Sequence, residues 1–225
     1  MNGHNLRRHR IRLKVCCIAS IEEAHLAIQC GADAIGLVGH MPSGPGIITD
    51  EIARDIAMQT PEQIATFLLS SETDAGNIAD HVRYVGATNI QIVQHIDPLE
   101  SQKLAALIPD IQRVQVIHVE GPQALALIPK YQPYINAFLL DSGKPSESIP
   151  ELGGTGRTHD WEVSRQFVSK SQLPVFLAGG LNPANISDAV WAVQPHGIDV
   201  CSGLRTNHQL DESKLRPFVA CIRDH

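Results

Sequence analysis

Short apolar runs alternate with longer amphipathic segments along almost the whole chain. The run VFLA at residues 175–178 is long enough for a strand that is buried on both faces. Residues 183–193, which follow it, have the apolar spacing and the opening proline of a helix. The pattern recurs eight times with a period of about 28 residues. It predicts strands at residues 13–18, 34–38, 64–69, 90–93, 114–119, 135–140, 175–178 and 198–201, and helices that begin near residues 21, 50, 75, 98, 122, 161, 183 and 211.

Regular alternation of strands and helices predicts a parallel sheet that is covered by helices. Eight units fit a single-domain α/β fold, the (β/α)8 or TIM barrel, whose usual length of roughly 250 residues is close to the 225 residues found. A doubly wound open sheet is the structural alternative. No composition shift marks a linker, so we expect one barrel domain at residues 13–225. Residues 1–12, which carry four arginines, are expected to form a disordered basic tail.

The overall composition narrows the function classes. The formal net charge of −6 argues against a nucleic-acid-binding surface, and no apolar stretch approaches the length of about 18 residues that a membrane span needs. Five cysteines, an odd number without a secretory leader, favour reduced thiols and a cytoplasmic protein. None of the 11 histidines forms an HxxxH pair and no CxxC is present, so we expect no metal.

Two glycine turns follow the seventh and eighth predicted strands. They are Gly179-Gly180 and Ser202-Gly203. Glycine lets the backbone approach a ligand closely because it has no Cβ, and in such a barrel the loops after strands 7 and 8 are the usual place for a phosphate. We therefore expect a phosphate group at the backbone N–H groups of Gly180 and Gly203.

Polar side chains stand near the C-terminal ends of the predicted strands, where barrel enzymes carry their catalytic groups. Cys16 follows strand 1, Asp141 ends strand 6 and Asp199 lies in strand 8. Strand alternation places Lys14 and Cys16 on one face and Cys17 on the other, toward the helices. Strands 1 and 8 are neighbours in a closed barrel, so Lys14 can pair with Asp199 and favour a thiolate at Cys16.

The same residues also have purely structural interpretations. A buried free cysteine is usually inert, and an aspartate at a strand end often only caps a turn. Lys14 and Asp199 can equally form a pair whose role is to stabilise the fold. Asp141 favours a functional role more strongly, because it leads into the longest loop of the chain, at residues 142–159.

Several motifs occur together, in order and with consistent spacing. KVCCI at residues 14–18 and GADAIGLV at residues 31–38 are similar to KICGI and GADAxGFVF of the phosphoribosylanthranilate isomerase family. The resemblance extends to about residue 218. The further motifs that carry it are FLLDS at residues 138–142, GGTGRTHDW at 153–161, VFLAGGLNPANI at 175–186 and IDVCSG at 198–203.

The resemblance implies an Amadori rearrangement in tryptophan biosynthesis, in which a phosphoribosyl amine opens its ring and becomes an amino-ketose. It implies that Cys16 is the general base at C2 of the ribose and that Asp141 is the general acid at the ring oxygen. It implies no cofactor, and a small phosphorylated sugar as the partner of a monomer or homodimer. The residues expected to bind the substrate or its phosphate are Gly179, Gly180, Ser202, Gly203, Thr155, Gly156, Asp199, Lys14 and Arg157.

Some positions depart from the family pattern. The family loop after strand 2 has an arginine for the anthranilate carboxylate, and residues 43–46 read Ser-Gly-Pro-Gly instead. The family motif QLHG becomes QIVQ at residues 91–94, and Cys17 replaces the glycine after the catalytic cysteine. These changes predict weak activity on phosphoribosylanthranilate. They leave open a related isomerase for a different phosphorylated sugar, or a non-catalytic phosphosugar-binding protein.

Arg157 is the first candidate to replace the missing arginine, with Lys144 and His40 as weaker candidates. Arg157→Ala is expected to raise KM for phosphoribosylanthranilate far more than it lowers kcat, because a charge-assisted hydrogen bond to a carboxylate contributes about 1.5–3 kcal/mol. This corresponds to about one to two decades in KM. Steady-state kinetics provides the measurement, and an unchanged KM would show that Arg157 only braces its loop.

Overall fold

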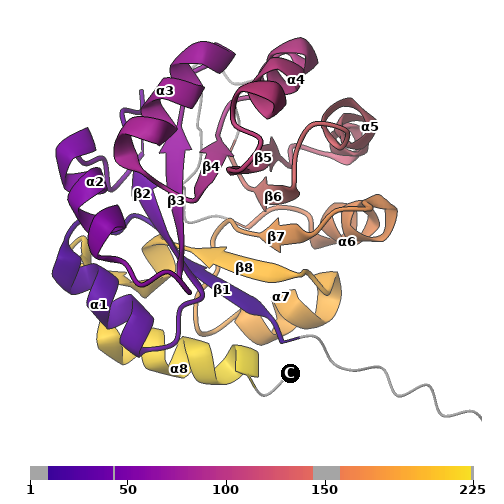
Figure 1. Ribbon diagram of the computed structural model, residues 1–225. Helices are drawn as coiled ribbons and strands as arrows, with labels where there is room; N and C mark the ends of the chain where they lie inside the picture. The colour runs from indigo at the N-terminus through magenta and orange to yellow at the C-terminus, as the bar shows by residue number, and fades with distance from the viewer. Residues whose placement is uncertain (1–9, 43, 144–157, 224–225) are drawn as a thin grey trace, which may run out of the picture.

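The computed structural model describes residues 10–42, 44–143 and 158–223. Eight parallel strands form a closed barrel in chain order, and the first strand pairs with the eighth. Helices surround the barrel on the outside (Figure 1). The strands are β1 (Arg12–Val15), β2 (Ala34–Val38), β3 (Ala65–Ser70), β4 (Asn89–Ile92), β5 (Gln112–His118), β6 (Ala137–Asp141), β7 (Val175–Leu177) and β8 (Gly197–Val200). The helices are α1 (Ile21–Gln29), α2 (Asp50–Gln59), α3 (Ala75–Val85), α4 (Pro98–Leu107), α5 (Ile128–Tyr131), α6 (Trp161–Lys170), α7 (Ile186–Val193) and α8 (Glu212–Arg223).

The predicted TIM barrel is confirmed, and the closed strand order excludes the open sheet. β1 begins at Arg12, one residue before the predicted start of the domain, while residues 1–9 lie outside the described residues. Two connections differ in detail. The segment predicted as one helix from 122 is a 3-10 helix, η1 (Pro122–Leu127), followed by the short α5. α7 begins at Ile186 rather than near residue 183, because Asn182 forms a turn with the N–H of Ala184.

Side-chain caps explain where several helices begin. The hydroxyl groups of Ser20 and Thr49 accept hydrogen bonds from the first turns of α1 and α2, and the carboxylates of Asp74 and Asp160 do the same for α3 and α6. Each cap satisfies an N–H group that has no partner within its helix. These local signals fix the ends of the helices that pack around the barrel.

Two apolar clusters fill the molecule. The larger one lies between the strands and the inward faces of the helices, with Phe138 and Phe167 in edge-to-face contact. The smaller one lies inside the barrel and includes Phe67, Val114 and Leu139. Side chains alternate along each strand, and the inward positions of β2, β3, β5 and β6 supply the buried strand residues of the smaller cluster. The interior is therefore packed, and ligand access is left to the loops at the strand ends.

A short hairpin after β8 is a feature that the sequence pattern does not predict. It consists of β9 (Arg205–Thr206) and β10 (Gln209–Leu210). The guanidinium of Arg205 donates to both carboxylate oxygens of Glu23 at 2.9 and 3.0 Å, and this carboxylate also accepts from the N–H groups of Ala19 and Leu210. The network joins the segment after β8 to the first turn of α1.

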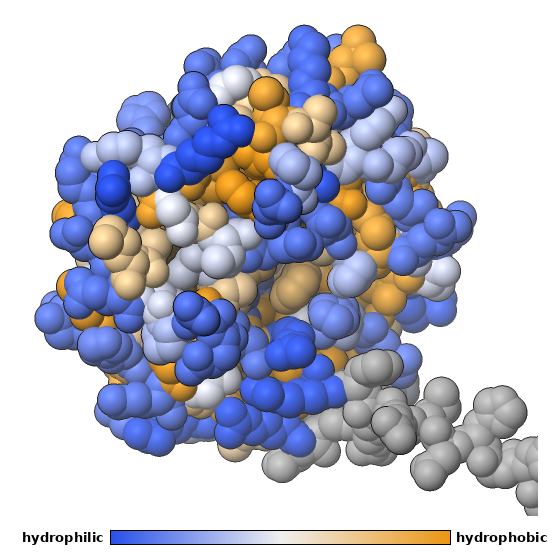
Figure 2. Space-filling view, viewed as in Figure 1, coloured by the Kyte–Doolittle hydropathy of each residue, from blue (hydrophilic) through white to orange (hydrophobic). Residues whose placement is uncertain are grey.

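Hydrophilic residues cover most of the face shown in Figure 2, and hydrophobic residues lie mainly in recesses between them. This agrees with helices whose apolar faces pack on the barrel. In the described part of the chain, no helix is both long and apolar enough to cross a membrane.

Gly86, which ends α3, has φ +75° and open space where a Cβ would lie. Gly86→Ala is therefore expected to act only through backbone strain and to lower the free energy of unfolding by about 1–2 kcal/mol. Gly86→Asn should lose less, because asparagine tolerates this conformation. Urea denaturation of both variants measures the difference, and equal losses would contradict the account of this cap.

Candidate active site

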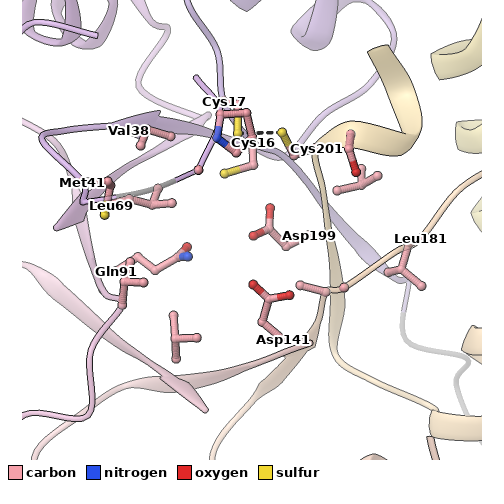
Figure 3. Close-up of a pocket in the computed structure, with 18 of the residues that line it drawn as sticks. Cys16, Cys17, Val38, Met41, Leu69, Gln91, Asp141, Leu181, Asp199 and Cys201 are labelled. Carbon is pink, nitrogen blue, oxygen red and sulfur yellow. Dashed lines mark hydrogen bonds between the residues drawn. The ribbon is translucent and has the colours of Figure 1, made fainter. Parts of the chain in front are cut away.

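A pocket opens at the C-terminal ends of the barrel strands (Figure 3). All eight strands, or the segments that follow them directly, contribute to its wall. This is the end at which barrel enzymes carry their active sites. The residues that line it are Cys16, Cys17, Val38, Met41, Gly44, Pro45, Leu69, Gln91, Val93, Val116, Asp141, Ala178, Gly179, Gly180, Leu181, Asp199, Val200, Cys201 and Ser202.

Lys14 and Asp199 form a buried ion pair beneath this pocket. The two residues are paired in the register of β1 and β8, and Lys14 Nζ lies 2.9 Å from Asp199 Oδ2. The Lys14 side chain is fully buried. Burial alone would lower the pKa of Lys14, but attraction to Asp199 and to Cys16 outweighs it, so the pKa is raised. Lys14 is therefore charged, and the pairing predicted from strand alternation is observed.

Cys16 directly follows β1, and its N–H donates to the carbonyl of Val200 at 2.8 Å. Its thiol points into the pocket (Figure 3). Gly36 of β2 provides the room, because a Cβ there would lie 2.8 Å from Cys16 Sγ and 3.0 Å from Lys14 Nζ. Arg205 donates to the carbonyl groups of Cys16 and Cys17 and so braces the backbone from the other side. The thiol position is set by contacts on both sides.

Asp141 ends β6 and points into the same pocket as Cys16 and Asp199 (Figure 3). Its Oδ1 accepts a hydrogen bond of 2.7 Å from the N–H of Ser142. Burial raises the pKa of Asp141 to about 6, with a further contribution from the Asp199 carboxylate, although the Ser142 N–H and Lys14 oppose the rise. A carboxyl group with this pKa can still carry a proton close to neutral pH, as a general acid requires.

The two glycine turns lie beside each other at one side of the pocket. Gly179 and Gly180 have φ +82° and +63°, and the carbonyl of Gly180 accepts hydrogen bonds from the side-chain amides of Asn182 and Asn185. A Cβ on Gly203 would lie 2.0 Å from the carbonyl oxygen of Leu181, so only glycine fits where the loops after β7 and β8 meet. The two loops therefore meet in a close contact, and phosphate binding at Gly180 and Gly203 stays a prediction.

Only some of the other predicted substrate-binding residues lie in the part of the chain that the structure describes. Ser202 lines the pocket beside the glycine turns. Thr155, Gly156 and Arg157 lie outside the described residues. Their roles therefore stay predictions from the sequence.

The predicted orientation of Cys17 toward the helix layer is wrong. Cys17 lines the pocket, and its sulfur lies 2.6 Å from that of Cys201 (Figure 3). The reason is that β1 ends at Val15 and Cys17 has φ +63°, so the alternation of strand side chains no longer applies at this position.

Gln91 is a pocket residue that the sequence reasoning did not select as functional. It lies in β4, is 4% exposed and points toward the middle of the cavity (Figure 3). Its side-chain oxygen and Asp199 Oδ1 are buried and have no hydrogen-bond partner within the described residues. The signal that could have found Gln91 is a polar residue inside the apolar strand NIQI. Both oxygens are available to accept hydrogen bonds from a ligand.

The ionisable lining of the pocket, as far as the structure describes it, is acidic. Asp141 and Asp199 are its acidic members, and none of the described residues that line it carries a cationic side chain. Within residues 10–42, 44–143 and 158–223, no three or more His, Cys, Asp or Glu side chains form a group that could hold a metal ion. The described wall thus offers three thiols, two carboxyl groups, the amide of Gln91 and the glycine turns.

A closed (β/α)8 barrel with an acid, a thiol and a glycine cradle at its C-terminal face has the construction of a phosphosugar-converting barrel enzyme. The family model for N-(5'-phosphoribosyl)anthranilate (PRA) isomerase matches residues 13–221. A Methanosarcina mazei protein named N-(5'-phosphoribosyl)anthranilate isomerase 2 is 35% identical over 211 residues, which cover 93% of this chain and 92% of that protein. The isomerase of Methanocella arvoryzae is 32% identical, with 94% and 98% covered. The chain belongs to the PRA isomerase family, as the sequence motifs predict.

Solved structures agree with this assignment. Phosphoribosyl anthranilate isomerase from Thermotoga maritima has a TM-score of 0.82 and 25% identity, covering 96% of this chain and 100% of that one. A crystal structure of the isomerase with reduced 1-(o-carboxyphenylamino)-1-deoxyribulose 5-phosphate has a TM-score of 0.79, 24% identity and the same coverage. The second likeness shows the shared fold.

The raised pKa of Asp141 predicts a pH-dependent stability. The carboxyl group titrates near 3.8 in the unfolded chain and near 6 in the folded protein, so the folded state binds the additional proton between these values. The free energy of unfolding is expected to fall as pH rises through this window, by on the order of 2 kcal/mol relative to Asp141→Asn. Urea denaturation of both proteins from about pH 4 to about pH 7 measures this difference. A difference that stays constant across the window would contradict the assignment.

Proposed function

We propose that this protein converts N-(5'-phosphoribosyl)anthranilate into the corresponding amino-ketose by an Amadori rearrangement. The observation that carries the proposal is that Asp141, with its raised pKa, and the Cys16 thiol point into one cavity beside the glycine turns. An acid and a base are the two groups that this reaction requires. The family to which the chain belongs supports the choice of substrate.

Asp141 starts the reaction by donating its proton to the ring oxygen of the ribose. The bond between this oxygen and C1 breaks, the ring opens and the nitrogen lone pair forms a protonated Schiff base with C1. A carboxyl group with an ordinary pKa would be almost fully ionised at neutral pH. Burial of Asp141 is therefore the feature that makes this proton available.

Cys16, as the thiolate, then removes the proton from C2 of the ribose. The electrons of the C2–H bond move toward the Schiff base and give an enol amine, which becomes the amino-ketose when C1 gains a proton and the C2 hydroxyl group loses its proton. The Lys14 ammonium lies beside Cys16, and their attraction contributes to the raised pKa of Lys14. Lys14 is held in turn by Asp199, so the ion pair fixes the ammonium group beside the base.

The remaining wall fits the two ends of the substrate. The loops after β7 and β8 would hold the phosphate, and Asp199 Oδ1 and Gln91 Oε1 would accept hydrogen bonds from ribose hydroxyl groups. Apolar Met41 and Leu69 lie across the cavity from Leu181 and offer a surface for the aromatic ring (Figure 3).

The lack of a cation in the described wall favours a second candidate. In it, the same chemistry acts on a phosphoribosyl amine without the carboxylate, because a buried carboxylate requires a charged partner. Comparing kcat/KM for phosphoribosylanthranilate and for the phosphoribosyl amine of aniline separates the two. A preference for the first supports the main proposal, and a preference for the second supports the alternative.

We also propose a cytoplasmic location and a monomeric or dimeric state. The odd number of cysteines and the absence of paired cysteine motifs support reduced conditions. The described cysteines are free thiols, which agrees with this. Fractionation and light scattering would test the two statements separately.

Cys16→Ser and Asp141→Asn are each expected to reduce kcat by about 10² or more, because each removes a group that transfers a proton. Cys17→Ser is the matched control, since it changes a neighbouring pocket thiol with no proton to transfer, and its loss should be much smaller. The decay of phosphoribosylanthranilate fluorescence provides the rate, and circular dichroism shows that each variant is folded. Equal losses at Cys16 and Cys17 would refute the assignment of the base.

A further inference from the structure

Two pocket thiols that the proposed reaction does not use lie in contact. Cys17 follows β1 and Cys201 follows β8, and their sulfur atoms are 2.6 Å apart although 184 positions separate them in the chain (Figure 3). Both are free thiols. Because β1 and β8 are hydrogen-bonded neighbours, the barrel itself holds the two sulfurs together. A disulfide bond length is about 2.05 Å, so only a small shift separates this contact from a covalent bond.

The backbone at Cys17 is unusual for a cysteine. Its φ of +63° lies in the left-handed region, which costs a residue with a Cβ roughly 1–2 kcal/mol. A Cβ on Gly46 would lie 2.5 Å from that of Cys17, so the opposite loop packs directly against this side chain. The Cys17 thiol therefore has little freedom to turn away from Cys201.

The two thiols differ in reactivity. Cys201 is partly exposed, and its pKa is lowered, first by the hydrogen bond with Cys17 and further by the guanidinium of Arg205. Cys17 is 6% exposed, and its hydrogen bonds with Cys16 and Cys201, together with burial, raise its pKa. A partly exposed thiol with a lowered pKa beside a buried thiol with a raised pKa is the arrangement of an attacking and a resolving cysteine.

We propose that Cys17 and Cys201 form a reversible oxidation site at the rim of the active-site pocket, with hydrogen peroxide as the oxidant. The Cys201 thiolate attacks one peroxide oxygen, the O–O bond breaks and hydroxide leaves, so Cys201 becomes a sulfenic acid. The Cys17 thiol then attacks the Cys201 sulfur, forming the S–S bond, and the hydroxyl group leaves as water with the Cys17 proton. The proton that Cys201 released on ionisation converts the hydroxide to water, so in sum two thiols lose two electrons and two protons, and the peroxide is reduced to two molecules of water.

A disulfide between Cys17 and Cys201 would affect the active site because each cysteine is bonded to a residue of that site. Cys17 directly follows the candidate base Cys16, and Cys201 directly precedes Ser202 of the glycine cradle. A covalent link would pull together the two loops that must accommodate the substrate between them. Turnover is therefore expected to fall at least tenfold when the disulfide is complete, and to return when dithiothreitol reduces it.

Peptide mapping tests the site without any reference to catalysis. The wild-type protein is treated with hydrogen peroxide, remaining thiols are blocked with N-ethylmaleimide, and the non-reduced digest is analysed by tandem mass spectrometry. A linked peptide that joins Cys17 to Cys201 is expected in the wild type, in Cys16→Ser and in the control Cys221→Ser. It should be absent from Cys17→Gly, in which glycine adopts the positive φ without strain, and from Cys201→Ser.

Turnover before and after peroxide, and again after dithiothreitol, provides the second readout. A link that involves Cys16, the absence of any link at peroxide levels that oxidise Cys201, or a complete Cys17–Cys201 bond with unchanged turnover would overturn the proposal. If phosphoribosylanthranilate is not converted at all, the proposed function fails on its own, and the mapping still decides whether the thiols form the bond.

Discussion

The ion pair between Lys14 and Asp199 is the interaction on which the active end of the barrel depends. An unpaired charge in such a buried position would cost several kcal/mol, so each partner holds the other in place. The pair spans β1 and β8, the strands that close the barrel, at a matched position of their register. Cys16 and Cys201 each follow two residues later. The candidate base and the oxidisable thiol thus lie directly beyond the two ends of this ion pair.

The space around this ion pair is also restricted. Gly36 leaves just enough room for the Cys16 sulfur and the Lys14 ammonium, and Gly203 allows the loop after β8 to reach the backbone of Leu181. A methyl group at Gly36 would displace the Cys16 sulfur and the Lys14 ammonium, and one at Gly203 would displace the backbone of Leu181. Burial in this packed wall also raises the pKa of Asp141. The close packing of this wall therefore sets both the positions of the side chains and the pKa of Asp141.

The sequence predicts features whose signals are local or periodic. Eight repeats of strand and helix predicted the closed barrel, and strand alternation predicted that Lys14 meets Asp199. Alternation failed at Cys17 because the strand ends two residues earlier and the backbone enters a left-handed conformation that propensity does not favour for cysteine. The pairing of Arg205 with Glu23 joins positions 182 residues apart, and no local sequence pattern predicts such a contact. What sequence reasoning missed was therefore set by tertiary structure.

The central claim is that an acid at Asp141 and a base at Cys16 make this chain a phosphoribosylanthranilate isomerase. Growth without tryptophan of a bacterial strain that lacks its own isomerase tests it most directly. The account predicts that the wild-type chain restores growth, and that Asp141→Asn, present at the same level and folded, does not. Failure of the folded wild-type chain to restore growth, or equal growth with Asp141→Asn, would contradict the account.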